Sequence, residues 1–400
     1  MIRGLKIALL GTRGVPAQYG GFETAVEEIG ARLVQRGHDV TVYCGRDSDN
    51  GEQYRGMRRV RVPALRKKAL ETLSRTGLST VHTLADRPDA ALVFNAANAP
   101  YVAMLRAARI PVALHIDGHD ARRAKWSGLG ARYYRSATKW GSSIADAVIV
   151  DSHAVQAELA ADYGVRADYI AYGAPEVHLD DRQVADVVGG HGLAPGRYHL
   201  VVARFEPENQ VLEIVEGYAA SSAQLPLVVV GFAGYPGDYA RSVVEAARRD
   251  DRIRLLGAVW DQQLLDALYA GARSYVHGHS VGGTNPSLLR AMAQSTPTIA
   301  YDCAYNRETT GGAALWFHGS DDVSDQLKVA EAEPALAGRL GAAAGRRAHE
   351  HYRWSDVTDD YEDLARSLAG RRSGKSAAVA ASARSRQQDR YDAQSDPAAS

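Results

Sequence analysis

A glycine-rich segment close to the amino terminus has the residue types of a phosphate-binding loop. Gly11–Thr24 reads GTRGVPAQYGGFET and follows the apolar run Leu5–Leu10, which predicts a buried parallel strand. Apolar residues at helical spacing come next, and a strand, a glycine-rich loop and a helix in succession direct backbone N–H groups towards an anion. A tight turn that needs glycine only for its geometry is the alternative. The length of the loop and its Arg13, Tyr19 and Glu23 side chains favour a ligand.

A second loop of this kind lies in the other half of the chain. His277–Ser287 reads HGHSVGGTNPS, in which Asn285 is a predicted helix N-cap and Pro286 suits the first helical position. The free N–H groups of Ser287 and Leu288 would then point at a phosphate. A capped helix with a flexible entry would use the same residues. Because each half of the chain has one such loop, we favour anion binding.

Arg204 directly follows the predicted strand His199–Ala203. An arginine at the carboxyl end of a strand can bind a diphosphate through its fork of N–H donors. The alternative is a surface ion pair with Glu206 or Glu208. The position of Arg204 at the strand end favours the diphosphate.

Acidic, histidine and amide side chains follow two strands of the first half. The segment His115–Asp120 contains Asp117 at a strand end, which suits general-base work or hydroxyl binding, although Asp-Gly is also a common turn pair. Asn95 and Asn98 follow the neighbouring strand. They are predicted either to bind sugar hydroxyls or to cap the helix after Pro100.

Other kinds of site are not indicated. His115 and His119 form one histidine pair, and His277 and His279 form another, but neither pair has a clear third metal ligand. The chain shows no serine nucleophile elbow, no Cys-x-x-Cys motif and no P-loop lysine. We therefore expect neither a metal nor a cofactor.

The elements that position these residues alternate between short apolar runs and amphipathic segments, which predicts an α/β fold with two Rossmann-like, doubly wound parallel sheets. Ligands are expected in a cleft between the carboxyl ends of the sheets. The predicted strands are Lys6–Leu10, Asp39–Tyr43, Ala90–Asn95, Val112–Ile116, Ala147–Val150 and Tyr169–Ala171, then His199–Ala203, Leu227–Val230, Ile253–Leu256, Ser274–His277 and Thr298–Tyr301. The expected parts are an N-terminal domain at 1–180, a linker at 181–196, a C-terminal domain at 197–350, a closing helix at 351–370 and a disordered tail at 371–400.

The charge balance, the local charge and the cysteine count bear on which partners and which compartment the protein has. Acidic and basic residues balance at 47 each, which argues against a general nucleic-acid binder. Residues 54–68 are locally basic and contain no acid, so they are predicted to face anionic lipid, an anionic acceptor or solvent. Two distant cysteines, with no signal peptide and no membrane-spanning apolar run, predict a cytoplasmic protein that is at most peripheral to the membrane.

These motifs resemble those of retaining glycosyltransferases of GT-B family 4. The resemblance is strongest to the rhamnosyltransferase-type subgroup, whose chains open with GTRGxPAxYGGFET. It covers roughly residues 5–368 and is carried by Gly11–Thr24, Phe94–Pro100, Ile116–Trp126, Arg204–Asn209 and His277–Ala293.

The resemblance implies a nucleotide-diphosphate-sugar donor bound mainly by the second half. Asp117 would lie next to the reacting anomeric carbon, Arg204 would hold the diphosphate, and backbone near Val259 would read the base. The implied donor-binding residues are Gly20, Gly21, Arg204, Asn209, Val259, Thr284, Asn285, Ser287, Leu288 and Arg290. The implied acceptor-binding residues are Arg13, Tyr19, Glu23, Asn95, Asn98, His119 and Arg123.

The implied activity is metal-independent transfer of a sugar, and the subgroup that the chain resembles implies rhamnose as that sugar. The acceptor would be a saccharide or a lipid-linked molecule in the synthesis of cell-surface polysaccharide or glycoconjugate, and the transfer would proceed with retention. Two alternatives are a non-catalytic nucleotide-sugar-binding subunit that supports a partner transferase, and a sugar-nucleotide epimerase.

This chain departs from the family pattern at several positions. Asn209 stands where many relatives have lysine, and Gly282 and Arg290 stand where the wider family has glutamates. His119 and Asp120 replace a usual Leu-Glu pair, which bears on acceptor choice. Arg290 could supply the cation that Asn209 leaves missing, face a different nucleotide or mark a weakened enzyme. We expect the first, a contact of Arg290 with the donor phosphate.

Overall fold

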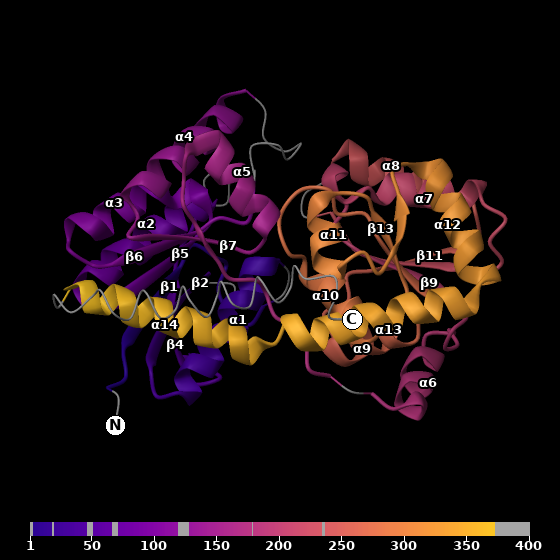
Figure 1. The fold of residues 1–400 in the computed structure, drawn as a ribbon, viewed down its shortest axis with the longest axis horizontal. Coiled ribbons are helices and arrows are strands. Elements are labelled where there is room, and N and C mark those ends of the chain that lie inside the picture. Colours follow the sequence, from indigo (N-terminus) through magenta and orange to yellow (C-terminus); the bar gives the residue numbers. More distant parts are fainter. Residues whose placement is uncertain are drawn as a thin grey trace, which may run out of the picture. The chain divides into compact units, whose positions relative to one another are not determined.

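The computed structural model describes residues 3–17, 20–45, 51–65, 71–118, 128–177, 179–233 and 237–372. These residues form two compact units (Figure 1). Unit 1 takes the described residues up to 118, together with 128–172 and 354–372, and unit 2 takes those of 173–353. Each unit is described by itself.

The described strands of unit 1 form one sheet in the order β3-β4-β2-β1-β5-β6-β7-β8. Every neighbouring pair is parallel except β3 and β4, and the central strands are buried on both faces, as parallel strands covered by helices usually are. The strands are β1 (Lys6–Leu10), β2 (Asp39–Gly45), β3 (Gln53–Tyr54), β4 (Met57–Val62), β5 (Ala90–Phe94), β6 (Val112–His115), β7 (Ala147–Val150) and β8 (Asp168–Tyr169).

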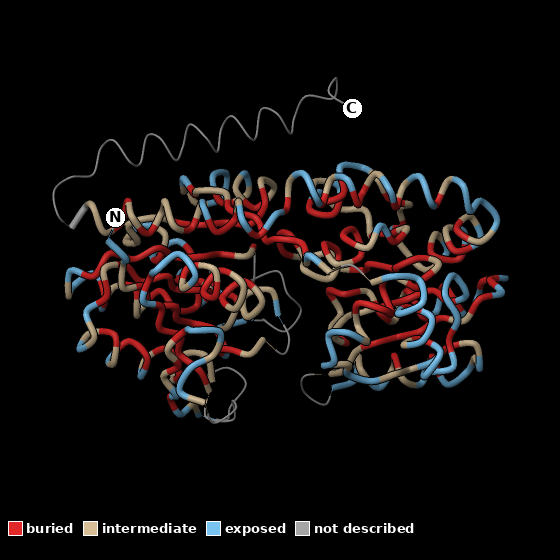
Figure 2. Tube along the Cα trace, turned by 90° about the horizontal axis from the view of Figure 1, so that it is seen from below, coloured by how far each residue is buried: buried red, intermediate tan, exposed pale blue. Residues whose placement is uncertain are grey.

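Helices cover both faces of this sheet, and buried positions concentrate in the strands between them (Figures 1 and 2). Helices α1 and α14 contact each other on one face, while α2, α3 and α4 pack side by side on the other. The helices are α1 (Gly21–Gln35), α2 (Glu71–Asp86), the 3-10 turn η1 (Ala96–Asn98), α3 (Ala99–Ala107), α4 (Leu129–Ile144), α5 (His153–Tyr163) and α14 (Trp354–Arg372).

The basic segment 54–68 differs from the expected solvent- or lipid-facing loop. Part of it is β4, which pairs with β2, and Arg59 on this strand is only 6% exposed. Arg58 forms an ion pair with Asp86 at 2.7 Å, and Arg55 forms one with Glu28 at the same distance. Met57 and Val62, the first and last residues of β4, are buried, and the charge of Arg58 is balanced by Asp86 from α2. Residues 66–68 lie outside the described residues.

Unit 2 contains a second parallel sheet, in the order β11-β10-β9-β12-β13-β14. Its strands are β9 (His199–Val202), β10 (Leu227–Val230), β11 (Ile253–Gly257), β12 (Ser274–His277), β13 (Thr298–Tyr301) and β14 (Leu315–Phe317). Its helices are α6 (Asp181–Gly189), the 3-10 turn η3 (Pro207–Asn209), α7 (Val211–Ala220), α8 (Asp238–Ala247), α9 (Gln262–Ala270), α10 (Pro286–Ala293), α11 (Ala304–Thr310), α12 (Ser320–Ala332) and α13 (Pro334–His351).

The predicted fold class, two parallel-sheet α/β units, is therefore confirmed. The segment expected to be a linker instead contains α6. Its first turn has a capping box in which Asp180 and Gln183 exchange hydrogen bonds, and Val184 and Val188 are buried in a helix that packs on α9. No helix of the described chain is long and apolar enough to span a bilayer.

Helix α14 returns to unit 1 from the carboxyl end of the described chain. Its Glu362 accepts a hydrogen bond from Arg36 at 2.9 Å and lies 3.2 Å from His38 Nε2. Tyr361 on the same helix forms a 2.9 Å hydrogen bond with Nδ1 of His115, at the end of β6. Burial alone would raise the pKa of Glu362, but hydrogen bonds from Arg366, Arg36 and His38 lower it to about 2. The carboxylate of Glu362 thus helps to hold α14 on unit 1.

Replacing Glu362 by glutamine is expected to lower the free energy of unfolding by about 1–3 kcal/mol at pH 7, because charged hydrogen bonds are lost. The folded-state pKa of Glu362 is depressed, so its stabilisation is present above about pH 4.5 and disappears as the pH falls towards about 2. The difference between wild type and Glu362→Gln in urea unfolding should shrink over that interval. The exposed Glu245→Gln is the control, and an equal loss at every pH would contradict the assignment.

Candidate functional site

Side chains behind the first glycine-rich loop hold it in place at the carboxyl end of β1. The N–H of Arg13 donates to Glu23 Oε1 at 3.1 Å, and the N–H of Ala17 donates to Glu27 Oε2 at 2.6 Å. Gly20, the residue before α1, lies against the Glu23 carboxylate and has a φ of 105°, a backbone conformation that favours glycine. The structure thus gives Glu23 a loop-positioning role. Tyr19 lies outside the described residues.

The guanidinium of Arg13 reaches across to α2. It lies 3.7 Å from Glu71, whose other oxygen accepts a hydrogen bond from Arg75 at 2.7 Å. The positive charge predicted for this loop is present, and it has an acidic neighbour within unit 1.

Of the two asparagines after β5, Asn95 caps the 3-10 turn η1 with its side chain, whereas Asn98 precedes α3 without a side-chain cap. Asn95 Oδ1 accepts hydrogen bonds from the N–H of Ala97 at 2.9 Å and from the hydroxyl of Tyr134 at 3.1 Å. Asn98 is fully buried and donates from Nδ2 to the Phe94 carbonyl at 2.8 Å. Both side chains therefore shape this end of the sheet, and Asn98 presents no surface to a ligand.

Asp117 lies two residues after the end of β6 and is half-buried, and Gly118 follows it at a φ of 123°. Behind it the ring of His115 is buried among aromatic rings, which include Phe22 and Tyr172. Burial lowers the pKa of His115 to about 3, so this imidazole is neutral. His119 and Arg123, both predicted to bind an acceptor, lie outside the described residues.

Tyr172 was not predicted from the sequence. Burial raises the pKa of its phenol, and the charges of Asp151 and Asp117 raise it further. Its hydroxyl is buried without a hydrogen-bond partner among the described residues, and its ring touches Gly21, which opens α1. Its place three residues after β8, at the carboxyl edge of the sheet, is the signal that could have found it.

Two loops of unit 2 meet at the carboxyl ends of β9 and β12. Asn209 donates from Nδ2 to the Arg204 carbonyl at 2.8 Å, and its Oδ1 lies 2.7 Å from Nδ1 of His279. A Cβ at Gly278 would collide with the Asn209 carbonyl, so glycine lets the two backbones touch. The structure thus places Arg204, Asn209 and the second glycine-rich loop together within one unit.

Glu208 lies inside this junction and was considered only as a possible partner of Arg204. It is 6% exposed, and neither carboxylate oxygen has a hydrogen-bond partner among the described residues. Its backbone carbonyl accepts hydrogen bonds from both the N–H and the hydroxyl of Ser280, at 2.9 Å each. A buried carboxylate without a partner is costly, so it marks a position where a hydrogen-bond donor would be stabilising.

The predicted N-cap of α10 is confirmed. Asn285 Oδ1 accepts hydrogen bonds from the Ser287 N–H at 3.0 Å and from the Ser287 hydroxyl at 2.7 Å. This corrects the expectation that the Ser287 amide is free for a phosphate. The N–H of Leu288 has no such partner in the described chain. Thr284, just before the cap, is buried.

Arg290 has a structural partner that the sequence did not reveal. Its Nη1 lies 3.4 Å from Oδ1 of Asp266 on α9, and its Nη2 donates to Gln262 Oε1 at 2.8 Å. The Asp266 side chain is 6% exposed. Burial raises the pKa of Asp266, whereas the charge of Arg290 lowers it. The predicted phosphate contact of Arg290 stays a prediction, with Asp266 as a competing partner.

The loop after β11 contains the remaining predicted donor residue. Gly257 has a φ of 70°, and the half-buried Val259 precedes Trp260, whose ring packs edge-on against Phe232 at 5.3 Å. Among the described residues, no cluster of three or more histidine, cysteine or acidic side chains is placed to hold a metal ion.

Comparison with known proteins adds two sequence matches that together cover most of both units. Residues 19–172 match the family described as Glycosyltransferase Family 4, and residues 196–330 match Glycosyl transferases group 1. The chain is also similar to O-antigen chain mannosyltransferase B of Escherichia coli, with 29% identity over 133 residues. That match spans 32% of this chain and about a third, 35%, of the relative.

Solved structures share the fold over nearly the whole chain. Sucrose-phosphate synthase from Thermosynechococcus elongatus has a TM-score of 0.77 and 20% identity, and the match covers 91% of this chain and 99% of that one. Anabaena HepE in complex with UDP-glucose has a TM-score of 0.74 and 15% identity, and the match covers 90% of this chain and 99% of that one. The α,α-trehalose-phosphate synthase of Burkholderia vietnamiensis has a TM-score of 0.67 and 14% identity, and the match covers 90% of this chain and 100% of that one.

Proposed function

Because the chain belongs to the GT-B family of glycosyltransferases, we propose that it transfers a sugar from a nucleotide-diphosphate sugar to a saccharide or lipid-linked acceptor. The observation that carries this proposal is the junction in unit 2, where Arg204, Asn209 and the loop before α10 meet at one edge of a parallel sheet. Ligands of such sheets bind at the carboxyl ends of the strands.

In this proposal unit 2 binds the donor. Arg204 holds the diphosphate, and the N–H of Leu288 and the positive end of α10 add to its stabilisation. The backbone near Val259 contacts the base. Glu208 accepts a hydrogen bond from a donor hydroxyl, which would satisfy its buried carboxylate. The cationic side chain and the helix end balance the leaving diphosphate, so the proposed reaction needs neither a metal nor a cofactor.

Unit 1 supplies the acceptor side. Asp117 lies at the carboxyl end of its sheet, where it would stabilise positive charge developing on the anomeric carbon, and the Gly20 and Gly21 amides would approach the donor phosphate. Retention of configuration and a role in cell-surface polysaccharide synthesis belong to the same proposal. Rhamnose comes from the motif resemblance, whereas the E. coli relative is named a mannosyltransferase, so both sugars are candidates.

A panel of thymidine-, uridine- and guanosine-diphosphate sugars tests the function. At a concentration 100 times its dissociation constant, the cognate donor should stabilise the protein by about 2.7 kcal/mol, which raises Tm by several degrees. The same donor should be hydrolysed slowly without an acceptor. Tight binding with neither hydrolysis nor transfer would support the non-catalytic subunit instead, and conversion of the free nucleotide sugar to its epimer would support an epimerase.

A further inference from the structure

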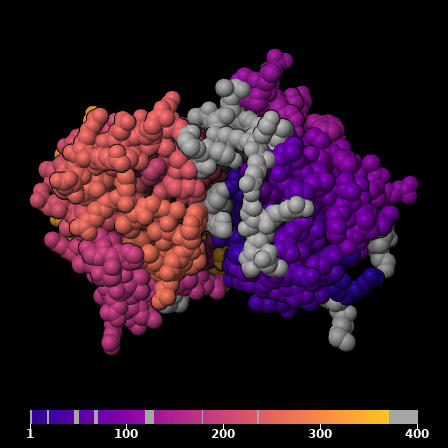
Figure 3. All heavy atoms as spheres, turned by 180° about the vertical axis from the view of Figure 1, so that it is seen from behind, coloured from indigo at the N-terminus to yellow at the C-terminus, as the bar shows by residue number. Residues whose placement is uncertain are grey.

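The exposed large apolar side chains of the described residues gather on one helical layer of unit 1. Outside this layer, only Leu65 and Trp260 are comparably exposed in the described chain. The amino-terminal end of α4 projects at the top of unit 1 in the space-filling view (Figure 3). The apolar residues of the layer are Leu78 and Val81 on α2, Met104 on α3, and Leu129, Tyr133 and Trp140 on α4.

The exposed charges on this layer have one sign. Helices α2, α3 and α4 contain two acidic residues, Glu71 and Asp86, and both are paired with cations at 2.7–2.9 Å. The exposed charged residues of the layer and its adjoining turns are all basic: Arg87, Arg106, Arg109, Arg132, Arg135 and Lys139. The outer face of the layer is therefore apolar and positive at once.

Helix α4 shows this pattern most clearly. Its buried residues face the sheet, and its exposed residues form two adjacent stripes, because positions three or four apart share one side of a helix. One stripe is Leu129, Tyr133 and Trp140, with Leu129 83% and Trp140 46% exposed. The other is Arg132, Arg135 and Lys139.

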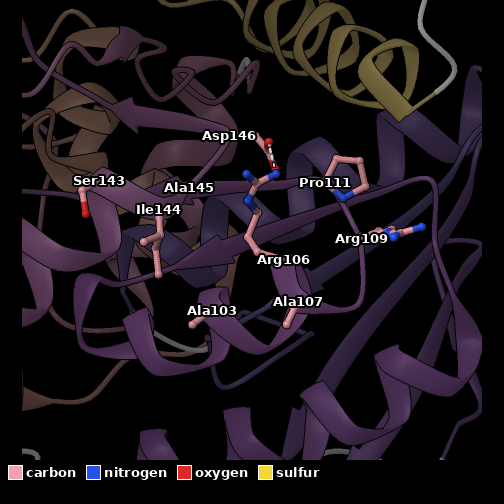
Figure 4. Close-up of a pocket in the computed structure, with 9 residues that line it drawn as sticks. All are labelled: Ala103, Arg106, Ala107, Arg109, Pro111, Ser143, Ile144, Ala145 and Asp146. Atoms are coloured by element: carbon pink, nitrogen blue, oxygen red, sulfur yellow. Dashed lines mark hydrogen bonds and ion pairs between the residues drawn. The ribbon is translucent and has the colours of Figure 1, made fainter.

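The carboxyl ends of α3 and α4 enclose a hollow, and Figure 4 labels the residues that line it. This pocket of about 830 Å³ is lined by small apolar residues, by Ser143 and by two arginines. Arg106 extends across it to pair with Asp146, while Arg109 has a left-handed backbone at a φ of 61° and is exposed. Asp146 balances the charge of Arg106, so Arg109 supplies the exposed cation beside this hollow, and such a cation suits an anionic headgroup.

We propose that the α2–α4 face docks unit 1 on a bilayer surface that contains anionic lipid. Tryptophan prefers the membrane–water interface because its ring is apolar and its N–H stays hydrated. Lysine and arginine lay their apolar stems along such a surface and keep their charges at the headgroups. Each cation near an anionic leaflet adds attraction, so the sign of the charge selects the lipid.

A second copy of the chain fits this face less well. A two-fold dimer contact places the same patch on both sides, so the cations of α4 would oppose their own copies. No acidic side chain is exposed on these helices to offset that repulsion. An anionic bilayer supplies the missing complementary charge.

The geometry of unit 1 connects this face to the proposed chemistry. Helices that join parallel strands run antiparallel to them, so α2, α3 and α4 begin at the sheet edge that bears Asp117. A docked unit 1 would hold this edge beside the headgroups, where a lipid-linked acceptor lies. The inference rests on the proposed function only for this acceptor, and its test uses no sugar transfer.

Co-sedimentation with phosphatidylcholine vesicles, with and without phosphatidylglycerol, tests the proposal. Wild type should bind only the anionic vesicles, and added salt should release it. Arg132→Glu/Lys139→Glu should weaken binding at least about tenfold, and Trp140→Ala about fivefold. The matched controls lie in unit 2: Arg248→Glu/Arg249→Glu removes two exposed cations, and Trp260→Ala removes a tryptophan that is 47% exposed.

Because the substituted charged side chains are exposed, the charge variants should keep the wild-type Tm, and both tryptophan variants should stay folded. Equal losses in the α4 and control variants, equal binding to neutral vesicles, or no binding to either vesicle would overturn the proposal. Sedimentation velocity without lipid adds a further arm: a dimer that the α4 variants dissociate would assign the face to a second copy. Failure of the vesicle test would leave the result of the nucleotide-sugar panel unaffected, and failure of that panel would leave the vesicle result unaffected.

Discussion

Arg204→Ala should lower kcat/KM for the donor about 10²–10³-fold, because it removes a preorganised cation from the leaving diphosphate. The carbonyl of Arg204 accepts hydrogen bonds from Glu206 N–H and Asn209 Nδ2, both at 2.8 Å, so the backbone that aims this side chain is fixed. The substitution leaves that backbone in place. The affinity for the nucleoside diphosphate should fall by about 1.5–3 kcal/mol, the range for a lost charged hydrogen bond.

Calorimetry with the nucleoside diphosphate and with the bare nucleoside separates this role from a general structural one. Affinity for the nucleoside should not change, since it has no phosphate. Arg204→Lys should recover part of the loss, because lysine restores the charge but not the two-pronged geometry. The exposed Arg248→Ala is the control. An unchanged diphosphate affinity in Arg204→Ala would remove Arg204 from the donor site.

The alternation of strands and helices was predictable because parallel strands are buried on both faces and read as continuous apolar runs. Strand β4 was not predicted, because it lacks such a continuous apolar run. Its Arg58, Arg59 and Arg61 interrupt the apolar pattern, and the ion pair of Arg58 is made with Asp86, 28 residues away. Helix α6 was missed because Asp181–Gly189 is short and begins with three polar residues, although its capping box is a local signal that predicts a helix start.

Contacts of the candidate site were predictable where residues close in the sequence make them. They were not predictable where the two partners are far apart in the sequence. The cap of Asn285 follows from a short motif, and the same rule implied that it would take up the Ser287 amide. The contact of Asn209 with His279 spans 70 residues, and that of Tyr361 with His115 spans 246. Such pairs depend on the order of strands in the sheet, which one sequence does not specify.

The ion pair between Arg290 and Asp266 is another such distant partnership, and breaking it should have a large effect on stability. Arg290→Ala leaves a buried carboxylate without its cation, which we expect to lower the free energy of unfolding by about 3–5 kcal/mol at neutral pH. Burial already raises the pKa of Asp266 above its unfolded value, and loss of Arg290 raises it further. A raised acid pKa means that stability falls as the pH rises through the interval between the unfolded and folded values. The deficit of Arg290→Ala should therefore be larger at pH 8 than at pH 5.

A double variant identifies the cause of this deficit. Asp266→Asn in the Arg290→Ala background removes the buried charge, so it should recover most of the stability and abolish the pH dependence of the deficit in urea unfolding. Donor affinity, measured where both variants are folded, then tests the phosphate contact expected of Arg290. If the double variant regains stability but still binds the nucleoside diphosphate weakly, Arg290 serves both partners. If it regains stability and full affinity, Arg290 is the counter-ion of Asp266 alone, and the donor site relies on Arg204 and the end of α10. A deficit that persists at every pH in the double variant would contradict the electrostatic account, because no buried charge would remain to explain it.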